Sequence, residues 1–313
     1  MTMTSLDTTA HTVQQRSAGA PPTVVFSLEV GESTGAGLHR ILLEQTELGA
    51  WHLERARLSD DHVHEVRKAT KRVRAVLRML SDDIDSRDYV RLNTEVRDLA
   101  RDLSQIRSAV VQVELLESLV TDDGQLTANT LGLHEELVAV ADRQRDGLGE
   151  TLVESLSSRL AAVRSDIAGT RLHDEQNASL GGIRRTYRRG RRSMTNAYEA
   201  PTIESFHVWR KQVKYLRHQM EILEWGGASA VSDLVVDLEE IGEGLGLDHD
   251  LADLEQAAEG VAPATLSPLG RRHLSDVISS RRASLELALK PVAARVYSAK
   301  PGAFAADVIP RSV

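Results

Sequence analysis

The chain has 313 residues, of which 41% are hydrophobic and 27% are charged, a composition typical of globular proteins large enough for a sizeable core. It contains no cysteine, which excludes disulfides, thiolate metal sites and cysteine nucleophiles and fits a reducing cytoplasm. No run approaches about 18 consecutive apolar residues, and the first 25 residues lack the apolar segment of a secretory signal. Neither a membrane span nor secretion is therefore expected.

Amphipathic spacing and capping residues predict an all-α protein. Residues 1–33 are expected to form a mobile N-terminal tail, in which Thr23–Val30 is the only strand candidate, and residues 298–313 a C-terminal tail. The predicted helices cover residues 37–58, 60 to about 80, 86–105, 108–121, 131–168, 179–198, 203–225, 229–245, 249–259 and 266–297.

The formal net charge of −8 conceals a strong segregation of charge. Residues 62–78 hold six Lys or Arg and one acid, and residues 184–217 hold ten Lys or Arg and two acids. The rest of the chain holds 22 basic and 43 acidic residues, a net charge of −21. Two strongly basic segments thus lie in an acidic body, which indicates a local site for an anionic partner.

An internal repeat joins these basic segments. The segment from His64 to Arg74 matches the segment from His207 to Arg217 at an offset of 143 residues, with five charged or titratable positions in common. The repeat predicts two similar helical halves, residues 34–170 and 171–297.

Each copy of the repeat predicts a cationic stripe along one helix face. At about 100° per residue, the basic residues of each copy fall on one side, with apolar residues such as Trp209 and Leu216 opposite. The first stripe consists of His64, Arg67, Lys68, Lys71, Arg74 and Arg78, and the second of His207, Arg210, Lys211, Lys214 and Arg217. Like charges at this spacing repel each other, and a bound polyanion would relieve the repulsion. The alternative to a binding surface is a basic face that is simply solvated. The occurrence of the same stripe in both copies of the repeat favours binding.

A third basic helix precedes the second stripe and contains Arg184, Arg185, Arg188, Arg189 and Arg192. Alone it would fit a nucleic-acid or membrane-surface patch equally well. Beside the two stripes we interpret it as a further wall of one cationic site.

Other chemistry has little support in the sequence. His62 and His64 point to different helix faces, and His207 and His218 are too far apart to chelate one ion. His62 is expected to cap its helix or lie on the surface. No nucleophile–base pair stands out, so no catalytic residue, metal or cofactor is expected.

Two further segments are interpreted as helix boundaries. Gly242, Gly244 and Gly246 lack the Lys-Ser/Thr of a phosphate-binding loop and are expected to end a helix. Asp248 or Asp250 is then expected to cap the next helix.

The two His-x-x-Arg-Lys-x-x-Lys helices and the arginine-rich helix resemble the CHAD domain, the conserved histidine α-helical domain. The resemblance implies two four-helix-bundle halves with pseudo-twofold symmetry around a basic central cavity, binding of inorganic polyphosphate and association with polyphosphate granules. It adds Arg72 and Arg107 to the ligand contacts formed by both stripes and the third helix. Two positions depart from the family. Ser108 stands where relatives have an acid, and Glu221 occupies the position in the second copy of the repeat that Arg78 occupies in the first.

The expected function is therefore non-enzymatic binding of polyphosphate in the cytoplasm. Binding of a nucleic-acid backbone is the alternative, although only Tyr187, Trp209 and Tyr215 lie near the stripes for base stacking. An enzyme acting on polyphosphate is the third reading and lacks acidic ligands for Mg²⁺. No membrane partner is expected, and a homodimer is left open.

Overall fold

The computed structural model describes residues 20–55, 59–103, 108–122, 124–146, 149–173, 179–224 and 229–308. Every regular element in these ranges is a helix, which confirms the all-α class, and Thr23–Val30 forms no strand. The helices are α1 (Thr34–Leu53), α2 (Asp60–Met79), α3 (Ser86–Asp102), α4 (Ser108–Asp122), α5 (Gly124–Asp146), α6 (Glu150–Gly169), α7 (Leu180–Glu199), α8 (Ile203–Leu223), α9 (Ser229–Gly260), α10 (Pro268–Val296) and α11 (Pro301–Val308). None of them has both the length and the apolar character needed to cross a membrane.

The two stripe helices, α2 and α8, begin at matching caps. The backbone N–H of His62 donates to Ser59 Oγ, and the Ser59 N–H donates to Nδ1 of His62, so His62 acts as a cap, as expected. Thr202 and Ser205 form the same reciprocal pair before α8. Such boxes satisfy backbone donors that a helix start leaves unpaired.

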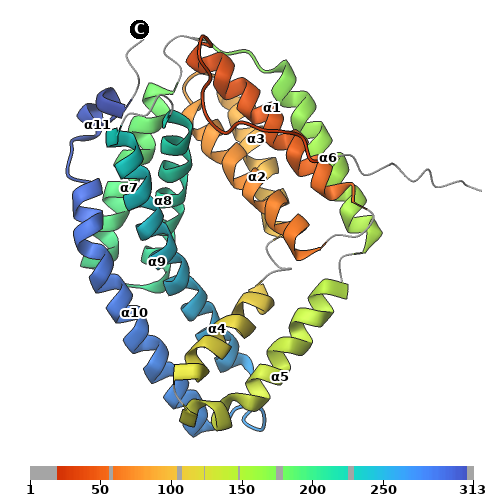
Figure 1. Ribbon diagram of the computed structural model, residues 1–313, viewed down its shortest axis with the longest axis vertical. Helices are drawn as coiled ribbons and strands as arrows, with labels where there is room; N and C mark the ends of the chain where they lie inside the picture. Colours follow the sequence, from red (N-terminus) through yellow and green to blue (C-terminus); the bar gives the residue numbers. More distant parts are fainter. Residues whose placement is uncertain are drawn as a thin grey trace, which may run out of the picture.

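Two hydrophobic cores hold the helices together. The larger joins α1, α2, α3 and α6 to α7, α8, α10, α11 and the first part of α9. The smaller lies at the other end of the molecule, where α4 and α5 meet the end of α9 and the start of α10 (Figure 1). Leu116 and Leu133 of the first half are buried there with Leu254 and Leu274 of the second. The cores therefore do not divide between residues 170 and 171, because α4 and α5 pack against the other half.

Helix α9 is continuous where two helices were predicted. Gly242, Gly244 and Gly246 lie inside it, and a Cβ on Gly244 would lie 2.8 Å from the Leu289 side chain on α10. Gly244 therefore allows close packing of α9 against α10, where a helix end was expected. Asp248 is buried inside α9, so it caps nothing, and it forms an ion pair with Arg282 at 2.9 Å.

The predicted helix over residues 131–168 is also wrong, since α5 ends at Asp146 and α6 starts after Gly149. Glycine there makes continuation of a helix unfavourable.

Both expected tails contain packed residues. The backbone N–H of Leu28 donates to the Ile222 carbonyl at 3.2 Å, and the Leu28 side chain is buried. At the other end α11 covers α7, and Phe304 stacks on Tyr187 with 3.8 Å between ring centroids. Apolar residues of both segments are part of the larger core, which the local sequence did not indicate.

Candidate functional site

The two stripes meet where α2 packs against α8, in the middle of the upper part of Figure 1. Lys214 of α8 lies beside Arg210 on its own helix and beside Lys71 and Arg67 of α2. Burial, together with these three positive charges, lowers the pKa of Lys214 to about 7, although Asp250 of α9 opposes the shift. Arg67, Lys71, Arg210 and Lys214, called the cation cluster below, thus bring both copies of the repeat into one half-buried group.

The α2 side of the site is held by contacts that its arginines make with α3 and α8. Arg67 donates from Nη1 to the Leu103 carbonyl at 2.9 Å, at the C-terminal end of α3, where a cation is favoured by the helix dipole. Arg78 and Arg74 lie over the Tyr215 ring of α8, with the guanidinium carbon 4.0 and 5.5 Å from its centroid. The first stripe is therefore fixed in place by residues of α3 and α8.

Acids neutralise the C-terminal end of the second stripe. Arg217 pairs with Glu221 at 2.9 Å and with Glu239 of α9 at 2.8 Å. Glu221 also contacts His218 at 2.9 Å, and Arg72 lies 4.1 Å from the centroid of the Phe26 ring. Within the second stripe, positive charge is therefore offset by ion pairs at the C-terminal end, at Arg217.

Helix α9 forms a third side of the site, which the sequence analysis missed. The negative charges of Asp250, Asp253 and, least, Asp248 favour the charged form of Arg210, and burial nevertheless lowers the pKa of this guanidinium. A signal was available, because Glu239, Gly246, Asp250 and Asp253 share one face if the helix continues through its glycines. The prediction of a break at these glycines concealed it.

Two histidines lie together beside Arg210. The rings of His207 and His249 have centroids 4.4 Å apart, and His249 lies 3.5 Å from Asp253. Burial first, and neighbouring cations next, lower the pKa of each to about 4. Both imidazoles are therefore neutral near pH 7 and can contribute hydrogen bonds to a ligand but no charge.

The remaining stripe residues lie at the rim. His64 and Lys211 are exposed, and Lys68 is half-buried with its ammonium 3.4 Å from Glu65. Arg107 lies outside the described residues.

The arginines of α7 form no hydrogen bond with the cation cluster among the described residues. Thr186 and Tyr198 are among the residues that contact α8, through Gln219 and Trp209, and the arginines lie on the opposite half of the helix. Arg185 bonds Ser81 at 2.5 Å and pairs with Asp82. Arg184, Arg188, Arg189 and Arg192 are exposed. That α7 forms a further wall of the same cationic site stays a prediction.

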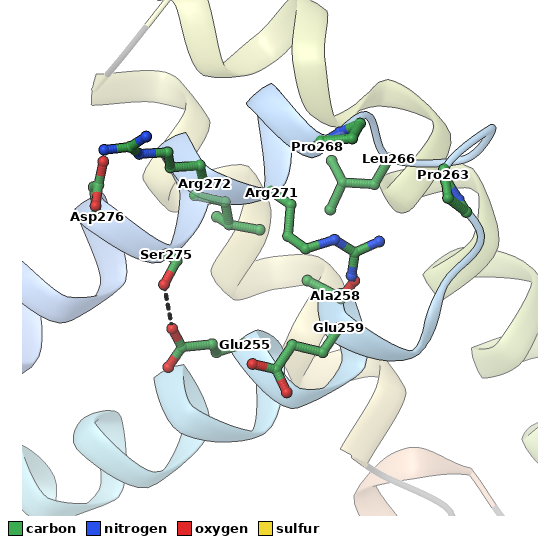
Figure 2. Close-up of a pocket in the computed structure, with 11 residues that line it drawn as sticks. Glu255, Ala258, Glu259, Pro263, Leu266, Pro268, Arg271, Arg272, Ser275 and Asp276 are labelled. Atoms are coloured by element: carbon green, nitrogen blue, oxygen red, sulfur yellow. Dashed lines mark hydrogen bonds between the residues drawn. The ribbon is translucent and has the colours of Figure 1, made fainter.

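Three pockets lie elsewhere and are lined by no stripe residue. One of about 330 Å³ lies between the end of α9 and the start of α10 (Figure 2). Two of its polar side chains are bonded within the protein: Arg271 donates to the Val261 carbonyl at 3.0 Å, and Ser275 donates to Glu255 at 2.6 Å, as Figure 2 shows. The expected basic cavity thus coincides with none of the three. No group of three or more His, Asp or Glu residues in the described ranges is arranged to hold a metal ion.

A family model, that of the CHAD domain, matches residues 41–259, most of the length of this chain. The chain belongs to the CHAD domain family. No curated protein matches it. Among solved structures, PptA from Streptomyces chartreusis has a TM-score of 0.59 at 18% identity, over 85% of this chain and 100% of that one. The CHAD domain from the plant Ricinus communis has a TM-score of 0.58 at 16% identity, over 87% and 94%. At these identities the two structures support the fold.

Proposed function

We propose that this CHAD-domain protein binds inorganic polyphosphate along α2 and α8 and catalyses no reaction on it. The observation that supports this most strongly is the cation cluster, in which the same two repeat positions from each copy lie together. The rest of the chain is acidic, so a polyanion is expected to bind at this site rather than over the whole surface.

Electrostatics supply the driving force. Half-buried like charges destabilise the free protein, and phosphate oxygens would offset both the repulsion and the lost hydration. Arginine offers a planar fork to two oxygens and lysine a point charge, so the cluster contains both types of phosphate contact. Binding would also release counterions from the polymer, and the affinity should fall steeply with salt.

The aromatic residues favour polyphosphate over single-stranded nucleic acid. Trp209 and Tyr187 are fully buried, and Tyr215 is covered by Arg74 and Arg78. None of the three offers an open ring on which a base could stack. A chain made only of phosphate needs no such ring.

Titration calorimetry with long-chain polyphosphate at several salt concentrations tests the proposal. The charge-reversed variant R67E/K71E/R210E/K214E should bind at least tenfold more weakly, since it loses four phosphate contacts. A matched control, R87E/R143E/R164E/R281E, changes the net charge equally at exposed positions and should retain most of the affinity. Equal loss in both variants, or tight binding by the first, would contradict the site.

Because the cluster is half-buried, four charge reversals there can also disturb folding. The milder K71Q/K214Q variant is therefore measured beside the R67E/K71E/R210E/K214E variant. Its circular dichroism spectrum should match that of the native chain, and its affinity should still fall. Incubation of the native protein with polyphosphate and Mg²⁺ should release no phosphate. In cells with polyphosphate granules, a fluorescent fusion of the native chain should collect on them, and the R67E/K71E/R210E/K214E fusion should stay diffuse.

A further inference from the structure

Lys214 differs from the other lysines of the chain in its surroundings. Six of the 38 basic residues are lysines. Lys68 lies 3.4 Å from Glu65, and Lys211 and Lys300 are exposed. Lys214 is half-buried and forms neither a hydrogen bond nor an ion pair with any described residue. This amine is therefore not used in holding the fold together, although burial of a charged group normally requires a partner.

The charged groups around this amine come from three helices. Arg210 lies on the same helix, Lys71 and Arg67 lie on α2, and Asp250 lies on α9. Burial and the three cations disfavour the ammonium form, and Asp250 opposes them only in part, which gives the lysine its pKa of about 7. About half of the amine is therefore neutral at pH 7, against roughly one part in 3,000 for an ordinary lysine. The neutral amine is the form that attacks a carbonyl carbon.

The amine can still be reached from solvent. The Nζ atom of Lys214 is not enclosed by protein atoms, whereas Nε of the neighbouring Arg210 is enclosed and has no hydrogen-bond partner. The guanidinium and ammonium groups beside the amine are of the types that bind phosphate oxygens. The site thus combines a nucleophile with a place for a phosphate group.

We propose that Lys214 forms a reversible covalent adduct with aldehydes that carry a phosphate group. The lone pair of the neutral amine attacks the carbonyl carbon, and a C–N bond forms. The resulting carbinolamine loses the carbonyl oxygen as water, which carries away both amine protons and leaves an imine. The step needs no oxidant or reductant. A phosphate group held by the cation cluster keeps the aldehyde beside the amine, which favours the attack.

This chemistry goes beyond the binding of polyphosphate and does not depend on it. The amine and its cationic neighbours are present whichever anion is the natural ligand. A bound polyphosphate chain should compete with the adduct, because it would occupy the same cations and favour the ammonium form of Lys214, which cannot attack.

The test treats the full chain with equimolar pyridoxal phosphate at pH 7, reduces the imine with borohydride and maps the labelled lysine by mass spectrometry. The label should lie on Lys214. K214R should lose it by about tenfold or more, and K300R, which changes an exposed lysine, should keep it. Pyridoxal, which has no phosphate, should label Lys214 far more weakly. Labelling should rise with pH to about 8 and then level off, whereas that of an ordinary lysine rises towards its pKa of about 10.4.

Several results would overturn the assignment. Label spread over the exposed lysines, or equal labelling of K214R and the native chain, would show that Lys214 is not the reactive amine. Equal labelling by pyridoxal would remove the role of the phosphate group. Mapping on the native chain decides these points even if K214R folds poorly. If long-chain polyphosphate binds and Lys214 stays unlabelled, this proposal alone fails. If Lys214 is labelled and polyphosphate does not bind, the proposed function fails and the reactive lysine stands.

Discussion

Lys71 and Lys214 occupy the same position in the two copies of the repeat, and the structure places them together where α2 packs against α8. A lysine that is buried beside a lysine and two arginines is a strained arrangement for a free protein. The free-energy cost of holding Lys214 charged at this position should appear both in the pH dependence of binding and in the stability of the protein.

Polyphosphate affinity should depend on pH through Lys214. With a pKa of about 7 in the free protein, this lysine is cationic below pH 7 and mostly neutral above it. A bound polyanion favours the cation, so binding above pH 7 takes up about one proton, and affinity falls by up to about tenfold per pH unit. Calorimetry in buffers of different ionisation enthalpy counts the proton.

The variant K214R separates the deprotonation of Lys214 from other causes of pH dependence, because arginine stays charged at every pH measured. It should bind more tightly than the native protein at pH 8.5 and take up less of a proton. K211R makes the same change at an exposed position of α8 and should behave like the native chain. An unchanged pH profile in K214R contradicts the role of Lys214.

The variant K214M should stabilise the protein while it weakens binding. The folded-state pKa of about 7 lies below the ordinary value of 10.5, so the unfolded chain holds more protons between these two values. The penalty from Lys214 is therefore full below pH 7 and disappears as the pH approaches 10.5. Thermal unfolding should show K214M a few degrees more stable at pH 6 and nearly equal at pH 10. An equal gain at both pH values would mean that packing, and not charge, is responsible.

Loss of one partner of the ion pair between Asp248 of α9 and Arg282 of α10 should lower the free energy of unfolding strongly. Asp248 is only 4% exposed and Arg282 15% exposed, so D248A leaves a buried cation with no partner of equal quality. Urea denaturation should show a loss of about 3–5 kcal/mol in the free energy of unfolding. The double variant D248L/R282M should recover most of it, since apolar residues can replace a buried pair. A double variant as unstable as D248A argues against this explanation.

Gly182 should not tolerate alanine. In most helix interiors this substitution stabilises by about 1 kcal/mol. Here the added Cβ would collide with the carbonyls of Arg78 and Met79, which are backbone atoms and cannot rotate away. G182A should therefore destabilise the protein by about 1–3 kcal/mol in urea denaturation. G302A adds a Cβ in open space on α11 and serves as the control, which should lose little. Similar values for both variants would contradict the close contact between α7 and α2.

The stripes were predictable because helical spacing alone separates a charged face from an apolar one. Trp209 and Leu216 are fully buried, as the spacing indicates, and the caps at Ser59 and Thr202 set the starts of α2 and α8 within one residue. Periodicity and capping are local properties, so the sequence shows them directly.

The relations between helices were not predictable in the same way. The continuity of α9 depends on how closely α10 approaches Gly244, and the acids whose charges act on Arg210 depend on that continuity. The sequence shows clearly which face of α7 is apolar. It does not show that α8 and α11 are the helices that cover this face. The orientation of its arginines follows from that choice of partners.

The smaller core has a consequence for how the chain is made. Leu116 and Leu133, from α4 and α5, are buried against Leu254 and Leu274, which a ribosome adds more than a hundred residues later. Until α9 and α10 emerge, these leucines remain in contact with water and are a target for chaperones and for aggregation. A fragment that ends at residue 173 would keep that exposed surface permanently and would lack half of the cation cluster, so the smaller core and the cluster both require residues of the two halves.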